Sequence, residues 1–124
     1  MSTHAESPSW QIVSLPDVAP IELTTGVLGY PLIGQGAMLN LLDIDPGAGV
    51  PLHDHPHEQL GLVISGELIL TLDGVERQLG PMDAYQLDGH LDHAARAGDA
   101  GCRVLDIFQP VREDYRERAE AAAG

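Results

Sequence analysis

Short apolar runs interrupted by turn residues restrict the fold of this chain more than any other feature. In "LGLVISGELILTLDGVERQLG" (60–80), Ser65-Gly66 and Asp73-Gly74 separate apolar runs of about six residues, as hairpin turns do. The same rhythm continues in "AMLNLLDID" (37–45), which ends at the turn signal "PGAG" (46–49), and in "DAYQLDG" (83–89), "HAARAG" (93–98) and "CRVLDIFQP" (102–110). Roughly seven or more short strands without helices between them predict a small all-β sandwich or barrel, not a parallel α/β fold.

The two ends of the chain differ from this pattern. We predict a flexible tail at 1–9 and an edge strand at "WQIVSL" (10–15) that ends at Pro16. The stretch "VREDYRERAEAAA" (111–123) has no Gly or Pro and many helix formers, so it predicts a helix. The expected organisation is a tail (1–9), one β-barrel domain (10–110) and a short C-terminal helix (111–124).

Composition limits the partners. The 124 residues are 44% hydrophobic and carry a formal net charge of −13, which suits one modest core and disfavours nucleic acid and anionic membranes. A small anionic substrate would need a local cation that reverses the field. Cys102 is the single cysteine, so no internal disulfide forms, and the N-terminal residues do not resemble a signal peptide. We therefore expect a cytoplasmic protein.

The stretch "HDHPHEQLG" (53–61) concentrates candidate metal ligands. His53 and His55 are two residues apart and so point to the same side of an extended strand. Gln59 follows Pro56 and could turn back toward them. Neutral imidazole nitrogens and an amide oxygen are ligands for divalent first-row metals. A polar loop that happens to hold histidines is the alternative interpretation.

The wider spacing resembles the cupin superfamily. Gly47, five residues, His53-x-His55, three residues, Gln59, six residues and Gly66 match the first cupin motif, with Gln in place of the usual Glu. The stretch "GPMDAYQLDGHLDHAA" (80–95) resembles the second motif, whose final histidine falls on His93. The resemblance covers roughly residues 37–110. It implies a double-stranded β-helix (jelly-roll) barrel that holds one divalent transition metal (nickel, zinc, manganese, iron or cobalt) through His53, His55, Gln59 and His93.

The second motif is imperfect. Asp88 stands where the pattern usually has Pro, and Met82 and His90 stand where it usually has Gly. If position 90 needs a positive φ, His is tolerated with some strain. His90 then either lies exposed in a turn or points inward as an acid–base group. His57 falls on a position that the pattern leaves free, and is expected at the rim rather than as a ligand.

The neutral ligand bears on the chemistry that the resemblance implies. Three histidines and a glutamate leave a divalent metal site with a net charge of about +1, whereas Gln59 leaves about +2. That favours Lewis-acid activation of a carboxylate or enolate over oxygen chemistry. Among cupins, a Gln at this position occurs in some isomerases and lyases.

The last predicted strand carries a second group of polar residues. In "LDIFQPVREDY" (105–115), Asp106 and Phe108 share one strand face. Pro110 ends the strand, so that Arg112 could fold back over the mouth of the barrel. The alternative places Phe108 in the core, pairs Arg112 with Glu113 or Glu117, and makes Asp106 the cap of a turn.

A narrower resemblance links the two regions. "HDHPHEQLGLVISGEL" together with "LDIFQPVREDY" is similar to the KdgF group of small cupins, which open the ring of 4,5-unsaturated uronates. This implies an isomerase in which Asp106 is the general base and then acid, Phe108 stacks on the sugar, and Arg112 clamps the substrate carboxylate.

Two further function classes stay open: another cupin enzyme (a biosynthetic cyclase, lyase or dioxygenase) and a non-enzymatic ligand- or metal-binding module. Solvent exposure of both Asp106 and Arg112 would favour the module. Small cupins commonly pair through edge strands, so we also expect a homodimer, with 10–15 as the edge.

Overall fold

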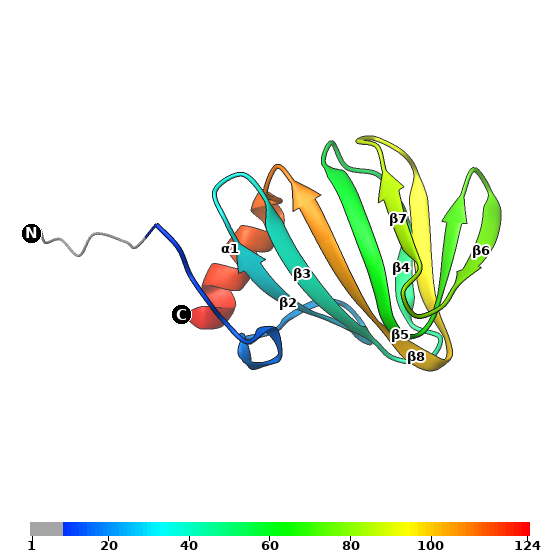
Figure 1. Ribbon diagram of the computed structural model, residues 1–124, viewed down its shortest axis with the longest axis horizontal. Helices are drawn as coiled ribbons and strands as arrows, with labels where there is room; N and C mark the ends of the chain where they lie inside the picture. The colour runs from blue at the N-terminus through cyan, green and yellow to red at the C-terminus, as the bar shows by residue number, and fades with distance from the viewer. Residues whose placement is uncertain (1–8) are drawn as a thin grey trace, which may run out of the picture.

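The structure, a computed structural model, describes residues 9–124. In chain order, the elements are η1 (Leu15–Asp17), β1 (Ile21–Thr24), β2 (Val27–Ile33), β3 (Met38–Ile44), β4 (Gly49–His53), β5 (Glu58–Leu72), β6 (Val75–Leu79), β7 (Ala84–Leu87), β8 (His93–Gln109) and α1 (Glu113–Ala123). The predicted all-β fold with one C-terminal helix is confirmed (Figure 1). The predicted tail at 1–9 lies outside the described residues, except for Ser9.

Two long antiparallel strands, β5 and β8, run through both layers of the barrel. Residues 58–63 of β5 lie between β7 and the second half of β8, and β3, β2 and β1 extend this layer beyond β8. Residues 68–72 of β5 lie between β6 and the first half of β8, which also pairs with β4. The two layers, β1-β2-β3-β8-β5-β7 and β4-β8-β5-β6, thus share their central strands, as Figure 1 shows.

Glycines mark the bends in these two strands. Gly66 in β5 has a φ of 78° and Gly101 in β8 a φ of 74°, which other residues rarely adopt. A side chain at Gly66 would overlap the carbonyl oxygen of Gly101, because the two backbones come into close contact there. The pairing register of β5 and β8 shifts on both sides of Ser65-Gly66, as at a β-bulge.

This bend corrects two predictions. Ser65-Gly66 is an irregularity inside β5 and not a hairpin turn, and the segments predicted at 93–98 and 102–110 are parts of one strand that ends at Gln109. A bulge and a hairpin turn both use glycine with a positive φ, so composition alone does not separate them. Asp73-Gly74 does form the predicted turn, between β5 and β6, with φ values of 51° and 76°.

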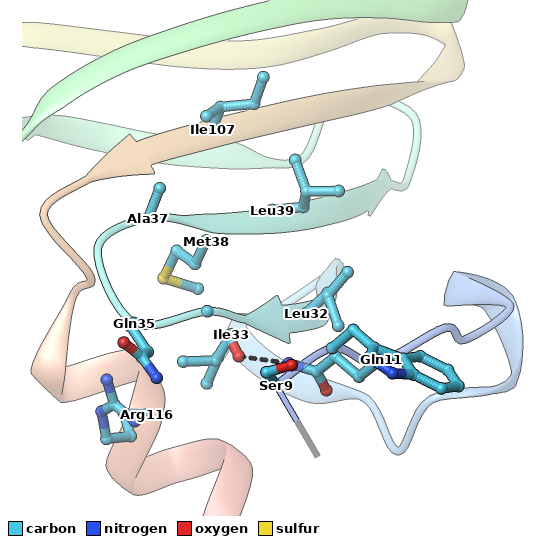
Figure 2. A pocket seen from close by; sticks show the side chains of 12 residues that line it. Ser9, Gln11, Leu32, Ile33, Gln35, Ala37, Met38, Leu39, Ile107 and Arg116 are labelled. Carbon is cyan, nitrogen blue, oxygen red and sulfur yellow. Dashed lines mark hydrogen bonds between the residues drawn. The ribbon is translucent and has the colours of Figure 1, made fainter.

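The N-terminal segment corrects a third prediction. Residues 10–14 form no strand, and Leu15–Asp17 form a 3-10 turn. The Gln11 side-chain amide donates a hydrogen bond to the Ile33 carbonyl (2.7 Å; Figure 2). All of residues 9–14 are exposed. The segment therefore has no buried face to fix a strand register, and β-forming residues alone do not supply one.

The core lies between the two layers. Its main cluster consists of Val27, Leu42, Ile44, Val63, Leu68, Ala97, Cys102 and Val104. A smaller cluster of Met38, Phe108 and Val111, with Ile33 and Tyr115 beside it, connects the end of β8 to the start of α1. This second cluster borders the polar site described next. Among residues 9–124, no helix is long and apolar enough to cross a membrane.

Candidate metal centre

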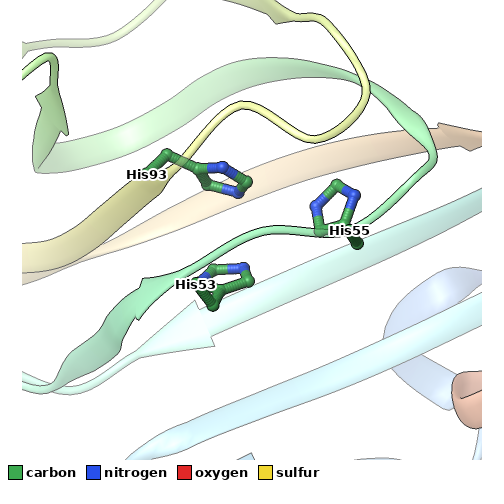
Figure 3. Close-up of side chains that lie close together, drawn as sticks. All are labelled: His53, His55 and His93. Atoms are coloured by element: carbon green, nitrogen blue, oxygen red, sulfur yellow. The ribbon is translucent and has the colours of Figure 1, made fainter.

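Three histidines converge inside the barrel, as Figure 3 shows. His53 ends β4, His93 begins β8, and these two residues are register partners. His55 follows β4 by two residues. One ring nitrogen from each histidine lies within 4.8 Å of the others. The structure thus brings together the three histidines that the two motifs select, from strands that are distant in sequence.

Backbone carbonyls orient all three rings. Each Nδ1 lies near a carbonyl oxygen two residues away: Pro51 for His53 (2.8 Å), His57 for His55 (3.1 Å) and Leu91 for His93 (2.7 Å). Because a carbonyl only accepts, each Nδ1 carries the hydrogen and each Nε2 keeps a lone pair. Nε2 of His93 is buried and has no hydrogen-bond partner in the part of the chain that the structure describes. This is the arrangement that orients histidine ligands toward a metal.

The electrostatics keep His55 and His93 in the form that binds metals. Burial, followed by the nearby positive charge of Arg112, lowers the pKa of His55 to about 4. Burial also lowers the pKa of His93. Both imidazoles are therefore neutral near pH 7, and a neutral imidazole is the ligand for a transition metal.

Gln59, near the start of β5, is the fourth candidate ligand. Its Oε1 lies 3.1 Å from Nε2 of His55, while hydrogen bonding from its side chain lowers the pKa of Asp106. The amide group of Gln59 is thus directed toward Asp106, and the amide oxygen of Gln59 faces the Nε2 lone pair of His55. Two facing acceptors share no hydrogen, but both can bind one cation. Three nitrogens and one neutral oxygen fit a divalent transition metal.

Asp106 lies in the second half of β8 and is only 4% exposed. It accepts a hydrogen bond of 2.7 Å from the hydroxyl of Tyr85. Burial raises the pKa of Asp106 to about 6, against the opposing effects of Tyr85, Gln59 and Arg112. The alternative in which Asp106 caps a turn is wrong, because the residue pairs with β3 and β5 on both sides.

Phe108 and Arg112 stand above Asp106. Phe108 is buried and packs edge-on against the rings of His55 and Tyr115. The Arg112 guanidinium carbon lies 5.1 Å from the centroid of the Phe108 ring and 3.9 Å from that of Tyr115. The Arg112 side chain is 12% exposed. Arg112 therefore folds back over the barrel, and Phe108 belongs both to the small core cluster and to the site.

The guanidinium of Arg112 also has an acidic partner, Asp114. Its Nε and Nη2 donate to the two carboxylate oxygens, at 3.3 and 3.0 Å. The predicted alternative partners are wrong: Glu113 pairs with Arg116, and no ion pair joins Arg112 to Glu117 among the described residues. Position 114 was overlooked because Arg112 precedes the helix, so helical spacing does not apply to it.

Within residues 9–124, two other histidines lie outside the candidate ligand set. His90 has a φ of 66°, so a residue other than glycine does adopt a positive φ there, and so does Met82, with 72°. The His90 side chain is 73% exposed and lies 3.6 Å from Asp54, so it does not point into the barrel. His57 is half-buried. Its pKa is lowered mainly by burial and, second, by the positive charge of Arg112.

Tyr85 is a site residue that sequence reasoning missed. It faces Asp106 from β7, two strands away, with Gly61 of β5 between them. The pairing of β5 with β7 is what brings it to the site, and no motif marks that pairing. The available signal was Gly61 within an apolar run, since glycine inside a strand often marks the close approach of another group.

Most of the site residues described above, though not His55, border one small cavity of about 40 Å³. Its polar lining consists of His53, Gln59, Tyr85, His93, Asp106, Arg112 and Tyr115, and Phe108 forms part of the apolar wall. A single water molecule in liquid water occupies about 30 Å³. The interior therefore accommodates an ion and the reacting end of a ligand, while the rest of a larger ligand must lie at the mouth.

Comparison with known proteins agrees with this geometry. A family model described as "Cupin domain" matches residues 40–108. The H2HPP isomerase of Bacillus subtilis is 34% identical over 77 residues, which make up 61% of this chain and 33% of that protein. The present chain therefore spans about a third of the length of that relative.

Solved structures extend the match to most of the fold. KdgF from Halomonas sp. superposes with a TM-score of 0.72 and 30% identity, over 77% of this chain and 91% of that chain. An RmlC-like cupin from Shewanella frigidimarina gives a TM-score of 0.78 and 28% identity, over 86% and 96% of the two chains. The family match covers more than half of the sequence and contains the three histidines, Gln59 and Asp106. The chain belongs to the cupin domain family.

Proposed function

We propose that this cupin is a metal-dependent enzyme of the isomerase or ring-opening type, acting on a small sugar-acid-like molecule with a carboxylate. One observation carries the proposal: candidate metal ligands, a buried acid and a cationic side chain border the same cavity. The similarity to KdgF and to a protein named as an isomerase supports the reaction class.

Burial favours an enzyme over a binding module. Asp106 and Arg112 both face the interior and are largely shielded from solvent. A protein that only stores a metal has no use for a buried carboxylate with a raised pKa beside the ligands, because such a group destabilises the fold.

In this proposal His53, His55, Gln59 and His93 hold the metal. A bound divalent cation supplies Lewis-acid polarisation of a substrate oxygen. Asp106 moves the proton. With a pKa of about 6, it takes the proton of the anomeric hydroxyl as the ring C–O bond breaks. It then gives that proton to the carbon skeleton, which converts the resulting enolate into the ketone. The reaction is an isomerisation, so atoms and electrons balance without a co-reactant.

Arg112 binds the substrate carboxylate in a bidentate pair. In the structure Asp114 takes that place, so the substrate carboxylate must replace it. Because Phe108 lies behind the Arg112 guanidinium, contact between the Phe108 ring and a sugar also requires Arg112 to move.

The direct test is turnover of unsaturated galacturonate and mannuronate monomers, followed by the loss of ultraviolet absorbance of the ring double bond. We expect an acceleration well above the spontaneous rate that a chelator abolishes. If metal-loaded protein accelerates neither reaction, the ring-opening assignment is wrong.

The carboxylate clamp has its own test. We expect Arg112→Ala to lower kcat/KM by on the order of 100-fold, which is the typical effect of losing a hydrogen bond to a charged group. Metal content and fold should be retained. Arg118→Ala, which removes an exposed arginine from the helix that follows Arg112, is the matched control. An unchanged rate in Arg112→Ala would exclude the clamp.

We also propose that the protein is a homodimer, through a surface other than the predicted edge. The outer side of the larger layer carries two rows of register partners: Leu32, Leu39, Ile107 and Leu60 in the first, and Tyr30, Leu41, Leu105 and Leu62 in the second. Of these, Leu41 is buried, at 5% exposed. We call these eight residues the outer apolar face. A groove of about 870 Å³ lies between its first row and residues 9–11 (Figure 2).

A further inference from the structure

A row of inward-facing residues crosses the larger layer at the level of Asp106. Asn40 of β3 is the register partner of Asp106 in β8, Asp106 is the partner of Gly61 in β5, and Gly61 is the partner of Tyr85 in β7. The neighbouring row, one step toward the mouth, contains Phe108 and Gln59, which are also register partners. Asp106 therefore lies one row away from Gln59, the candidate metal ligand of this layer.

Gly61 leaves a gap in this row, and the ring of Tyr85 fills it. A methyl group at position 61 would overlap Cζ, Cε1 and the hydroxyl oxygen of Tyr85. The ring thus lies across β5, and its hydroxyl reaches Oδ1 of Asp106, two strands away, at 2.7 Å. Any larger residue at position 61 would block this path.

The other neighbours of Asp106 do not replace this contact. The Asn40 amide is fully buried, yet neither of its polar atoms has a hydrogen-bond partner within residues 9–124. It lies instead against Gly29, where a methyl group would come within 2.7 Å of its Oδ1. Hydrogen bonding from the Gln59 side chain lowers the pKa of Asp106, but Gln59 also belongs to the candidate ligand set. Tyr85 donates to Asp106 and does not belong to the candidate ligand set.

We propose that Tyr85 is a positioning residue that fixes the Asp106 carboxylate through Oδ1 and leaves Oδ2 for the proton of the substrate, and that Gly61 provides the space this requires. The proposal rests on the proposed function, because it concerns the same carboxylate. Burial raises the pKa of Tyr85 well above its ordinary value, so its hydroxyl keeps its hydrogen and always donates. A rigid carboxylate is productive more often than one free to rotate.

The kinetic test uses the metal-loaded full chain. We expect Tyr85→Phe to lower kcat by about tenfold to 100-fold, as for a lost hydrogen bond to a charged group, with KM within about twofold of the wild type. Gly61→Ala should give a similar loss although the hydroxyl remains, because the ring is displaced. In an Asp106→Asn background, Tyr85→Phe should cause no further loss. Tyr30→Phe, on the outer apolar face, is the matched control.

The opposite kinetic results would overturn the proposal. Wild-type kcat in Tyr85→Phe, or the same fractional loss in the Asp106→Asn background, would mean that Tyr85 does not act through Asp106. Metal content and melting temperature of each variant separate these results from misfolding. If Gly61→Ala does not fold, Tyr85→Phe still decides.

A structural readout keeps this inference separate from the assignment of the reaction. Crystal structures of the metal-loaded wild type and of Tyr85→Phe should show the Asp106 carboxylate rotated or in two conformers in the variant, with β8 unchanged. An identical Asp106 in both structures would refute the positioning role. If the wild type turns over neither uronate, the proposed function fails, and this comparison alone decides the role of Tyr85.

Discussion

Asp106 carries a cost that a purely structural residue would not. Burial raises its pKa from 3.8 to about 6, so the folded protein binds the proton of this carboxyl more tightly than the unfolded chain does. By linkage, its contribution to stability is fully present below about pH 4 and is lost as the pH rises through about 6. The charged form at neutral pH is thus tolerated at the expense of the fold, as is common for active-site acids.

Asp106→Asn should therefore stabilise the metal-free protein. At pH 7.5 we expect its free energy of unfolding to rise by on the order of 2 to 3 kcal/mol, because a neutral amide avoids the desolvation of a charge. At pH 4 the gain should nearly vanish. Urea unfolding with a chelator present, at both pH values, measures this, and the exposed Asp99→Asn serves as control. A gain that does not depend on pH would refute this explanation.

The ligand assignment makes a prediction at the same scale. His93→Ala removes one of three converging imidazoles, so its affinity for a divalent metal should fall by more than about 100-fold, since even losses outside the ligand set cost 10- to 100-fold. His90→Ala, which removes an exposed histidine from the preceding turn, should keep the metal. Metal content after dialysis, with circular dichroism to check the fold, decides. Full occupancy in His93→Ala would show that the ligand set is wrong.

Local spacing and strand pairing differ in how well sequence reveals them. His53, His55 and Gln59 lie within seven residues, so a motif captures their convergence. His93 needed the second motif, because its pairing with His53 depends on how β4 meets β8. Tyr85 was missed because its position follows only from the register of β5 and β7. Its contact with Asp106 is a consequence of tertiary pairing, which local residue pattern does not contain.

At the scale of elements, glycine has one role inside β5 and another in the turn that follows it. Gly66 and Gly74 have nearly the same φ, 78° and 76°. A side chain at Gly66 would overlap the backbone of β8, whereas nothing lies within 4 Å of one at Gly74. The first glycine permits two strands to touch, and the second only permits a turn. This is why Asp73-Gly74 behaved as predicted and Ser65-Gly66 did not.

The two glycines should respond differently to the same substitution. Gly74→Ala should cost about 1 kcal/mol of unfolding free energy, from the left-handed backbone alone. Gly66→Ala should cost more than about 3 kcal/mol, because the contact with Gly101 is also disrupted. Chemical denaturation of both variants measures the difference. Equal costs would mean that the close approach of β5 and β8 does not matter for stability.

At the scale of the whole molecule, the outer apolar face is unusual for a lone chain. An antiparallel sheet with one face on the core normally presents polar residues on the other, but here two rows of register partners are apolar. The charged pair beside the second row is neutral as a unit, since Arg103 donates to both carboxylate oxygens of Asp43, at 2.7 and 2.9 Å. With a net charge of −13, two copies repel each other least where such a face meets its equivalent.

This surface predicts the state of the protein in solution. The wild type should have twice the 13.2 kDa mass of the chain by sedimentation velocity, and added salt should strengthen the dimer by screening the repulsion between two acidic copies. Leu60→Arg, in the first row of the outer apolar face, should yield the monomer. Leu52→Arg brings the same charge to an exposed leucine of β4, outside that face, and should stay dimeric. A monomeric wild type would mean that no second copy covers this face. A dimer that persists in Leu60→Arg would mean that the copies meet elsewhere, because two inserted charges repel each other only across a shared interface.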